Sequence, residues 1–331
     1  MDYQLKDIIL DVEKEKVKAL LKQNGLSYED HINHTIGLFD GDVLIATGSL
    51  DDNVIKMLAV DVKYQGEQHL STILTKLISL LNQERKYKFF VFTKPNNKKF
   101  FLDYNLFLIY EDQHILFFEN KIDTIVETLH DLKYQLNLSR GSTASLVMNC
   151  NPMTNGHQYL IETAARSHDH VLIFLVEENK SVFPFDVRFK IVKKTAKKLK
   201  NVKIIPSTPY IISTATFPTY FSKTVNESTL LYTTLDIHIF KTYFMNILGI
   251  DYRYVGTEPL DPLTNIYNET MKQIIGDQLV IVERLKNEDE TISASYVRKL
   301  AQEKKFDEIK KLVPQATYQF LKSKKGQKLF L

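Results

Sequence analysis

The second half of the chain alternates short, fully apolar segments with amphipathic ones, and this pattern constrains the fold more than any other feature. Ala144–Met148, Val171–Val176 and Val202–Ile205 are apolar along their length, as expected for strands that are covered on both faces. Between them lie His157–Ser167 and Phe185–Leu199, where apolar residues recur at helical spacing. Repeated strand–helix–strand units imply right-handed crossovers. The sequence therefore predicts an α/β fold, a doubly wound parallel sheet with helices on both faces.

The first half has a mixed pattern. Asp11–Gln23 carries apolar residues among lysines and glutamates, which predicts an amphipathic helix. Asp40-Gly41-Asp42 separates two apolar runs and predicts a hairpin turn. Leu70–Leu81 again has helical spacing. These features indicate an α+β region before the parallel sheet.

The length of 331 residues suits two domains better than one. The best linker candidate is Ser139-Arg140-Gly141-Ser142, because it consists mainly of small and polar residues and follows a helix predicted over Ile122–Asn137. We predict an N-terminal domain over residues 1–138 and a parallel-sheet domain over residues 139–331.

Composition narrows the class of protein. Hydrophobic residues make up 44% and charged residues 25%, values typical of a soluble globular protein. The formal net charge of +3 lacks the strong basic excess of most nucleic-acid binders. The single cysteine, Cys150, cannot form an intrachain disulfide. Met1–Leu10 is too charged for a signal peptide, and no apolar run is long enough for a bilayer. We expect a cytoplasmic protein with no nucleic-acid or membrane partner.

The most informative segment joins the first of these strands to its helix. It consists of Asn151-Pro152-Met153-Thr154-Asn155-Gly156-His157. In such a sheet, ligands bind beyond the carboxyl ends of the strands, and backbone N–H groups at a helix start attract phosphate. Gly156 allows close backbone approach, Thr154 offers a hydroxyl, and the imidazole of His157 can donate to a phosphate oxygen that gains charge. An ordinary histidine in the first turn of a helix is the structural alternative.

A second segment also suits phosphate. It consists of Ile292-Ser293-Ala294-Ser295-Tyr296-Val297-Arg298. Ser293 and Ser295 are short hydroxyl residues at the start of a predicted helix, where serine caps free N–H groups. Arg298 lies one turn later and can contact two phosphate oxygens at once. Taken alone, this segment fits a capped helix with a surface arginine.

Both segments resemble signatures of the nucleotidyltransferase superfamily. Thr154-x-Gly156-His157 resembles the first signature, whose first position is His or Thr, and Ile292–Arg298 resembles the second, Ile-Ser-Ser-Thr-x-x-Arg. Their order and separation favour nucleotidyl chemistry over chance. Further stretches are similar to those of the citrate lyase ligase family, and the resemblance runs from about residue 5 to the C-terminus. These stretches are Asn149–Leu160, Ser181–Phe189, Thr216–Phe221 and Tyr254–Pro259.

The resemblance implies a reaction. Ligases of this family combine ATP, acetate and the thiol of the citrate lyase acyl carrier subunit, which ends a phosphopantetheine-type arm, and release AMP and pyrophosphate. It implies catalytic roles for His157, Thr154 and Arg298. It also implies ATP contacts from Asn151, Pro152, Met153, Gly156, Ser293 and Ser295. Mg²⁺ would bridge phosphate oxygens with few protein ligands, so we expect no metal motif.

Two further charged residues are candidates for ATP contacts. Arg188 follows Phe183-Pro184-Phe185 and could meet a phosphate or the acetate, or be a solvated helix arginine. Glu258 follows Gly256-Thr257, where adenosine would lie in such a sheet, or is a loop carboxylate.

The N-terminal region resembles the acetyltransferase fold of the GNAT type. Gln65 begins the loop that binds coenzyme A pyrophosphate in that fold, but Gln68 and Leu70 occupy its later small positions. Phe101 stands where many acetyltransferases place a tyrosine acid, and a phenyl group has no proton to give. We therefore expect a docking surface for the carrier or its arm, with a purely structural role as the alternative.

Other functions stay open at this point. An adenylyltransferase that acts on a phosphorylated metabolite would release pyrophosphate without an acid or a thiol. A GNAT-type acyltransferase would use acetyl-CoA and no ATP. A non-catalytic nucleotide sensor or scaffold would tolerate loss of Thr154, Gly156, His157 or Arg298, all of which are present.

Overall fold

The computed structural model describes residues 3–29, 32–178, 181–218, 220, 229–257, 261–287 and 290–330. The chain divides into two compact units, Met1–Thr128 and Leu129–Leu331. This division falls within helix α4 (Ile125–Leu136), and the candidate linker of residues 139–142 follows that helix. The domain boundary at residues 138 and 139 stays a prediction.

The N-terminal unit is built on a mixed sheet. Its described strands follow the order β1-β2-β3-β4-β5-β7-β6. Their bounds are β1 Tyr3–Asp7, β2 His34–Asp40, β3 Val43–Asp51, β4 Val54–Val60, β5 Phe90–Thr93, β6 Phe107–Glu111 and β7 Leu116–Glu119. Neighbours pair antiparallel except β4 and β5, which are parallel. The predicted hairpin is confirmed as β2 and β3, which pair around Gly41.

Two helices cover opposite faces of this sheet. They are α1 (Asp11–Gln23) and α2 (Glu67–Gln83), and a short helix α3 (Lys98–Asp103) follows β5. Short 3₁₀ turns η1 (Val62–Tyr64) and η2 (Pro95–Asn97) precede α2 and α3. The apolar stripe of α1 packs in one buried cluster and that of α2 in another. After β1 the elements follow the order helix, three strands, helix, strand, helix, strand. This order agrees with the acetyltransferase-type fold that the N-terminal region resembles, with β7 added.

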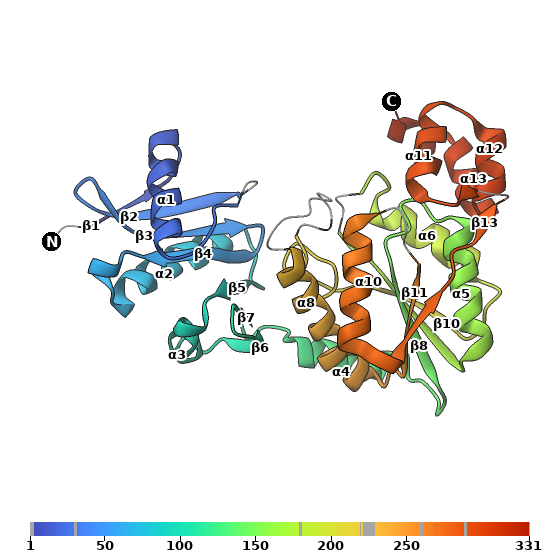
Figure 1. Ribbon diagram of the computed structural model, residues 1–331, viewed down its shortest axis with the longest axis horizontal. Coiled ribbons are helices and arrows are strands. Elements are labelled where there is room, and N and C mark those ends of the chain that lie inside the picture. The colour runs from blue at the N-terminus through green and yellow to red at the C-terminus, as the bar shows by residue number, and fades with distance from the viewer. Residues whose placement is uncertain are drawn as a thin grey trace. The chain divides into compact units, whose positions relative to one another are not determined.

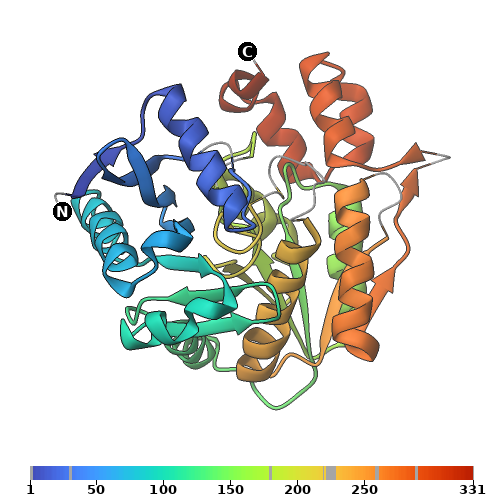
Figure 2. The same cartoon turned by 60° about the vertical axis from the view of Figure 1, so that its left-hand side comes forward.

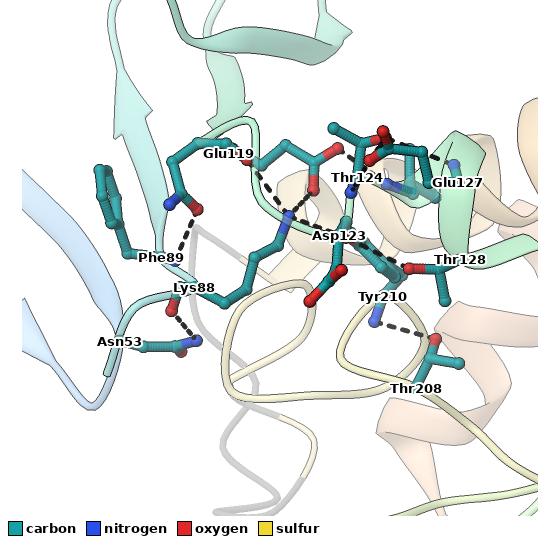
Figure 3. Close-up of polar contacts among 12 residues, drawn as sticks. Asn53, Lys88, Phe89, Glu119, Asp123, Thr124, Glu127, Thr128, Thr208 and Tyr210 are labelled. Carbon is teal, nitrogen blue, oxygen red and sulfur yellow. Dashed lines mark hydrogen bonds and ion pairs between the residues drawn. The ribbon is translucent and has the colours of Figure 1, made fainter. Parts of the chain in front are cut away.

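A buried carboxylate, that of Glu119, connects the end of β7 to the start of α4 (Figure 3). Lys88 donates to the fully buried carboxylate of Glu119. The other Glu119 oxygen accepts from the backbone N–H of Ile125 at 2.9 Å. Thr124 and Glu127 add a reciprocal cap, in which the Thr124 N–H donates to Glu127 at 2.8 Å. Burial of Glu119 is therefore compensated by charge and hydrogen bonds, as buried carboxylates require.

The C-terminal unit confirms the predicted doubly wound sheet (Figure 1). The described strands of this sheet are all parallel, in the order β10-β9-β8-β11-β12. Their bounds are β8 Thr143–Met148, β9 His170–Leu175, β10 Val202–Pro206, β11 Tyr252–Gly256 and β12 Leu279–Val282. The chain winds outward in one direction from β8 and in the other from β11. A crevice forms at such a reversal, beyond the carboxyl ends of the two strands.

Helices cover both faces of this sheet. Helices α5 (Asn155–Ser167) and α6 (Phe185–Ala196) pack on one face, and α8 (Thr229–Ile239) and α10 (Pro262–Ile275) on the other (Figure 1). Helix α8 continues through η3 (Phe240–Met245) and α9 (Asn246–Leu248), and η4 (Gly276–Gln278) follows α10. The predicted helix over Phe185–Leu199 ends early, because the chain turns where the Leu199 N–H donates to the Ala196 carbonyl.

A cluster of helices closes the chain (Figure 2, red end). Its members are α11 Ala294–Gln302, α12 Phe306–Leu312, α13 Gln315–Lys322, α14 Lys324–Gln327 and the turn η5 Lys328–Phe330. They follow a short hairpin, β13 (Lys286–Asn287) and β14 (Glu290–Thr291), and share one buried apolar cluster. Within the part of the chain that is described, no helix has the length and apolarity that a bilayer span needs.

Candidate active site

A cavity of about 720 Å³ lies at the carboxyl ends of β8 and β11, where the strand order reverses. Met148 and Asn149 line it at the end of β8, and Gly256 and Thr257 line it at the end of β11. This is the position at which a sheet of this topology binds ligands. Residues from both signature segments border the same cavity.

The first segment is organised by a reciprocal cap at the start of α5. Thr154 Oγ1 accepts the N–H of His157 at 3.4 Å, and His157 Nδ1 accepts the N–H of Thr154 at 3.0 Å. Such a box satisfies two backbone donors that a helix start otherwise leaves without helical partners. Because Nδ1 is an acceptor, the neutral imidazole carries its hydrogen on Nε2. His157 is thereby a fixed hydrogen-bond donor in the cavity lining.

The charge state of His157 follows from its surroundings. Burial, together with the smaller effect of the positive charge of Arg284, lowers the pKa of this imidazole from 6.5 to about 4. The side chain is therefore neutral near pH 7. A neutral N–H donor can strengthen its hydrogen bond as charge builds on a phosphate oxygen, without a proton transfer.

We expect the His157 imidazole to stay neutral as the Nε2–H tautomer between about pH 8 and pH 5. The unfolded chain takes up this proton near pH 6.5 and the folded chain only near pH 4. Stability from this residue is therefore complete above pH 6.5 and is lost as the pH falls toward 4. ¹⁵N spectra of histidine-labelled protein measure the tautomer and the pKa of His157, and the signal is assigned by its loss in His157→Ala. A midpoint near 6.5, or hydrogen on Nδ1, would contradict the proposed geometry.

The second segment meets the first directly. Ser293 caps α11 by accepting the Tyr296 N–H at 3.1 Å. Arg298 donates from Nη2 to Ser295 Oγ at 3.1 Å and from Nη1 to the backbone carbonyl of Asn151. The N-termini of α5 and α11 therefore converge on one cavity, each with its partly unpaired N–H groups.

Gly156 is not required by packing within the protein. A Cβ placed there would lie 3.6 Å from Thr154 Oγ1 and 3.9 Å from the Ile292 carbonyl oxygen, which are ordinary contacts. The residue lines the cavity. Close approach of a ligand to the backbone at Gly156 therefore stays a prediction, to which packing within the protein offers no alternative.

Two residues of the first segment lie elsewhere than expected. Pro152 and Met153 are buried and are not among the residues that line the cavity. Met153 packs in the core cluster between the sheet and α5, and its carbonyl accepts from Thr317 Oγ1 at 2.9 Å. Burial of both side chains gives them a role in the shape of the loop, and their predicted ATP contacts have no support from the cavity lining.

Arg188 also differs from the expected phosphate or acetate contact. It is fully buried, and it does not belong to the cavity lining. Its guanidinium donates to the carbonyls of Phe183, Asn149, Val176 and Glu178 at 2.6–3.0 Å. Nη1 also reaches Asn149 Oδ1 at 3.1 Å. We therefore assign Arg188 a positioning role, in which it holds the chain that follows β8 against the chain that follows β9.

Glu258 and Cys150 complete the residues of the sequence analysis that bear on this site. Glu258 lies outside the described residues, so its expected adenosine contact stays a prediction. Cys150 is buried, and burial raises the pKa of its thiol to about 12, so this sulfur stays protonated and is a poor nucleophile.

Sequence reasoning missed two arginines in the cavity lining, Arg253 and Arg284. Arg284 follows β12 at the same sheet edge as the other site residues, and its N–H donates to Thr257 Oγ1 at 3.1 Å. A signal for Arg253 exists in Tyr252-Arg253-Tyr254-Val255-Gly256, where a charge interrupts an otherwise apolar strand.

The N-terminal unit has a smaller cavity of about 330 Å³, lined by Gln68, Ser71, Phe100, Asp103 and Tyr104. Phe101 is fully buried in the core of that unit. Its ring therefore cannot meet a substrate, in keeping with the absence of a proton to donate.

Comparison with known proteins identifies relatives of this chain. The model of the citrate lyase ligase C-terminal domain matches residues 143–321. The chain is 32% identical to the citrate (pro-3S)-lyase ligase of Escherichia coli K12 over 317 residues, which cover 93% of this chain and 90% of that protein. It is 30% identical to the Haemophilus influenzae protein of the same name, over 92% of this chain and 94% of that one. The chain belongs to the citrate lyase ligase family. Family membership covers both units, because the match extends well beyond the C-terminal domain.

Solved structures are similar over about a third of the chain. Escherichia coli ElaA is 13% identical, covers 36% of this chain and 100% of its own, and has a TM-score of 0.31. Arabidopsis thaliana Naa50 is 14% identical, covers 37% and 100%, and has a TM-score of 0.32.

Proposed function

We propose that this member of the citrate lyase ligase family activates acetate as acetyl-adenylate with ATP. It then transfers the acetyl group to the thiol of the prosthetic group on the citrate lyase acyl carrier subunit. The citrate lyase part of this proposal is supported by the relatives, which are named citrate (pro-3S)-lyase ligases. The acid and the acyl-adenylate rest on the chemistry of the site and on the family resemblance.

One observation carries the proposal. The hydrogen bond from Arg298 to the Asn151 carbonyl brings two helix N-termini and a guanidinium to one cavity. Further donors in the described lining include the imidazole of His157, the hydroxyl group of Ser295 and the side chain of Arg284. Positive helix ends, an arginine and neutral N–H and O–H donors are the groups that stabilise a triphosphate and its leaving pyrophosphate.

The residues would act mainly by charge compensation. A carboxylate oxygen of the acid forms a bond to the α-phosphorus as the bond from that phosphorus to the bridging oxygen breaks, and pyrophosphate leaves with the electron pair. His157 would donate to the phosphate oxygens that gain charge, and Arg298 would hold the leaving group. In the second step a thiolate attacks the acyl carbon, the C–S bond forms and AMP leaves. Neither step needs a covalent bond to the protein.

Carboxylates are scarce in this cavity. Among the described lining residues they are Asp261 and Glu283. Asp261 already accepts from the N–H groups of Leu263 and Thr264 at the start of α10. Mg²⁺ on the triphosphate would supply further charge neutralisation, with Glu283 as the available protein oxygen ligand.

We expect the purified protein to exchange labelled pyrophosphate into ATP only when acetate is present. The reason is that an acyl-adenylate returns to ATP when pyrophosphate attacks it, whereas without an acid there is no adenylate. The measurement is the rate of label uptake with and without acetate, with the relatives' carrier subunit as acceptor in a second assay.

Other outcomes would identify the alternatives. Exchange that needs a phosphorylated metabolite in place of acetate would indicate an adenylyltransferase. Acetylation of the carrier from acetyl-CoA without ATP would indicate a GNAT-type transferase. Absence of exchange with every acceptor would favour a nucleotide sensor. Each of these results would refute acetate activation.

A further inference from the structure

Arg253 is a buried cation without the hydrogen bonds that such a group needs. It lies in β11, is 2% exposed, and lines the cavity. Two of its donors, Nε and Nη1, have no hydrogen-bond partner in the part of the chain that the structure describes. Arginine stays protonated in proteins, and a buried charge without hydrogen bonds is strongly unfavourable. Arg188, equally buried, shows that this chain can satisfy a guanidinium with carbonyls where its role is structural.

The carboxyl group of Asp236, which interacts electrostatically with Arg253, is already held by other donors. Asp236 on α8 is fully buried and interacts electrostatically with Arg253. Its Oδ1 accepts from the Ile212 N–H at 2.7 Å and from Thr216 Oγ1 at 2.8 Å. Its Oδ2 accepts from Tyr267 Oη at 2.6 Å. Asp236 therefore offsets the charge of the guanidinium while its own oxygens are held by other donors.

Arg253 lies on a different face of the sheet from α5. Successive strand residues point to opposite faces, and Tyr254 packs in the cluster with α5 and α6. The Arg253 guanidinium instead lies 4.3 Å from the ring centroid of Phe240, on the side of α8 and α10. The cavity thus extends from the N-termini of α5 and α11, whose donors suit phosphate, to the guanidinium of Arg253.

The surroundings of this cation select a ligand class. The ring of Phe217 stacks on that of Tyr267, with centroids 5.5 Å apart, and Ile212 and Met271 add apolar wall to the same cavity. A phosphate group would need several donors, as the convergent helix starts provide, whereas a carboxylate with a short alkyl chain needs one guanidinium and an apolar surface.

We infer that Arg253 binds the carboxylate of a small monocarboxylic acid, with Phe217, Tyr267 and Ile212 around its alkyl group. Arg253 would then determine acid binding, separately from the residues that hold ATP. This inference rests on the proposed activation of an acid and names the part of the site that recognises it.

Arg253→Met tests the assignment, since it removes the charge and keeps much of the volume. In acetate-dependent pyrophosphate exchange, we expect the KM for acetate to rise about 100-fold, with the KM for ATP within about threefold of wild type. Arg253→Lys should fall between the two. Arg166→Met makes the same change at an exposed helix position and should behave as wild type.

The outcomes separate this inference from the proposed function. Wild-type protein without acid-dependent exchange would refute the proposed function whatever Arg253 does. Wild-type exchange with an unchanged acetate KM in Arg253→Met would overturn the role of Arg253 alone. A rise in the KM for ATP with no change for acetate would instead assign the guanidinium to phosphate.

A measurement on the wild-type chain guards against misfolding of the variant. In ¹⁵N-arginine spectra, we expect the Arg253 Nε–H signal, assigned by its loss in Arg253→Lys, to shift when sodium acetate is added. Inorganic phosphate should leave it unchanged. A shift with phosphate and none with acetate would refute carboxylate binding at this residue.

Discussion

His157→Ala is expected to reduce acetate-dependent pyrophosphate exchange by roughly 100- to 1,000-fold, the usual effect of removing one donor that stabilises developing charge. The reciprocal bond between Nδ1 and the Thr154 N–H fixes the donor Nε2 in place before any substrate binds. Loss of that pre-set donor raises the barrier of the chemical step more than it weakens ATP binding. The measurement is kcat for exchange, together with the affinity for ATP.

Two variants control this experiment. His157→Gln keeps a side-chain N–H and should recover part of the lost rate, whereas His114→Ala removes an exposed histidine and should have no effect. The cap lost in His157→Ala should cost about 1 kcal/mol of stability, too little to unfold the unit. If exchange in His157→Ala persists near the wild-type rate, His157 is a structural cap and not a catalytic residue.

Arg188→Met is expected to lower the stability of the C-terminal unit by about 3–5 kcal/mol. The guanidinium donates to four backbone carbonyls, and methionine would leave these buried oxygens without their donor. Urea unfolding followed by far-UV circular dichroism measures the change, because the chain has no tryptophan. Since two units can unfold separately, the relevant transition is the one that MgATP shifts to higher urea.

Arg166 provides the matched control for this stability prediction. Its side chain is 70% exposed and pairs only loosely with Glu162 at 3.4 Å, so Arg166→Met should change stability by no more than about 0.5 kcal/mol. Arg188→Lys should lose an intermediate amount, because one ammonium cannot reach all of the carbonyls. A change in Arg188→Met as small as the control would show that these carbonyls find other donors. Arg188 would then return to the candidates for ligand contact.

Much of the fold was predictable because it follows from local patterns. Fully apolar runs separated by helical periodicity indicate a parallel sheet, and β8, β9 and β10 lie where those runs are. Helix α1 begins and ends at the predicted residues, since its apolar spacing and its Asn24-Gly25 end are both encoded locally. Strand β7 and the early end of α6 were missed, because pairing partners and turns depend on distant segments.

The candidate site was predictable in part for a related reason. Its two signature segments are each a strand or loop followed by a helix N-terminus, and their caps involve residues three positions apart. Their convergence was only an expectation from resemblance until Arg298 was found to donate to the carbonyl of Asn151, 147 positions away. Such a contact requires the whole sheet to be in place.

Arg188 and Arg253 show most clearly the difference between what the sequence determines and what the tertiary structure determines. The sequence by itself set the parallel sheet, the two helix starts and the residue types that face a phosphate, because these depend on neighbours along the chain. Tertiary structure alone decided that Arg188 is saturated by carbonyls while two donors of Arg253 have no partner among the described residues. Hydrogen-bond satisfaction depends on which distant oxygens the fold brings within reach, and no local pattern records that.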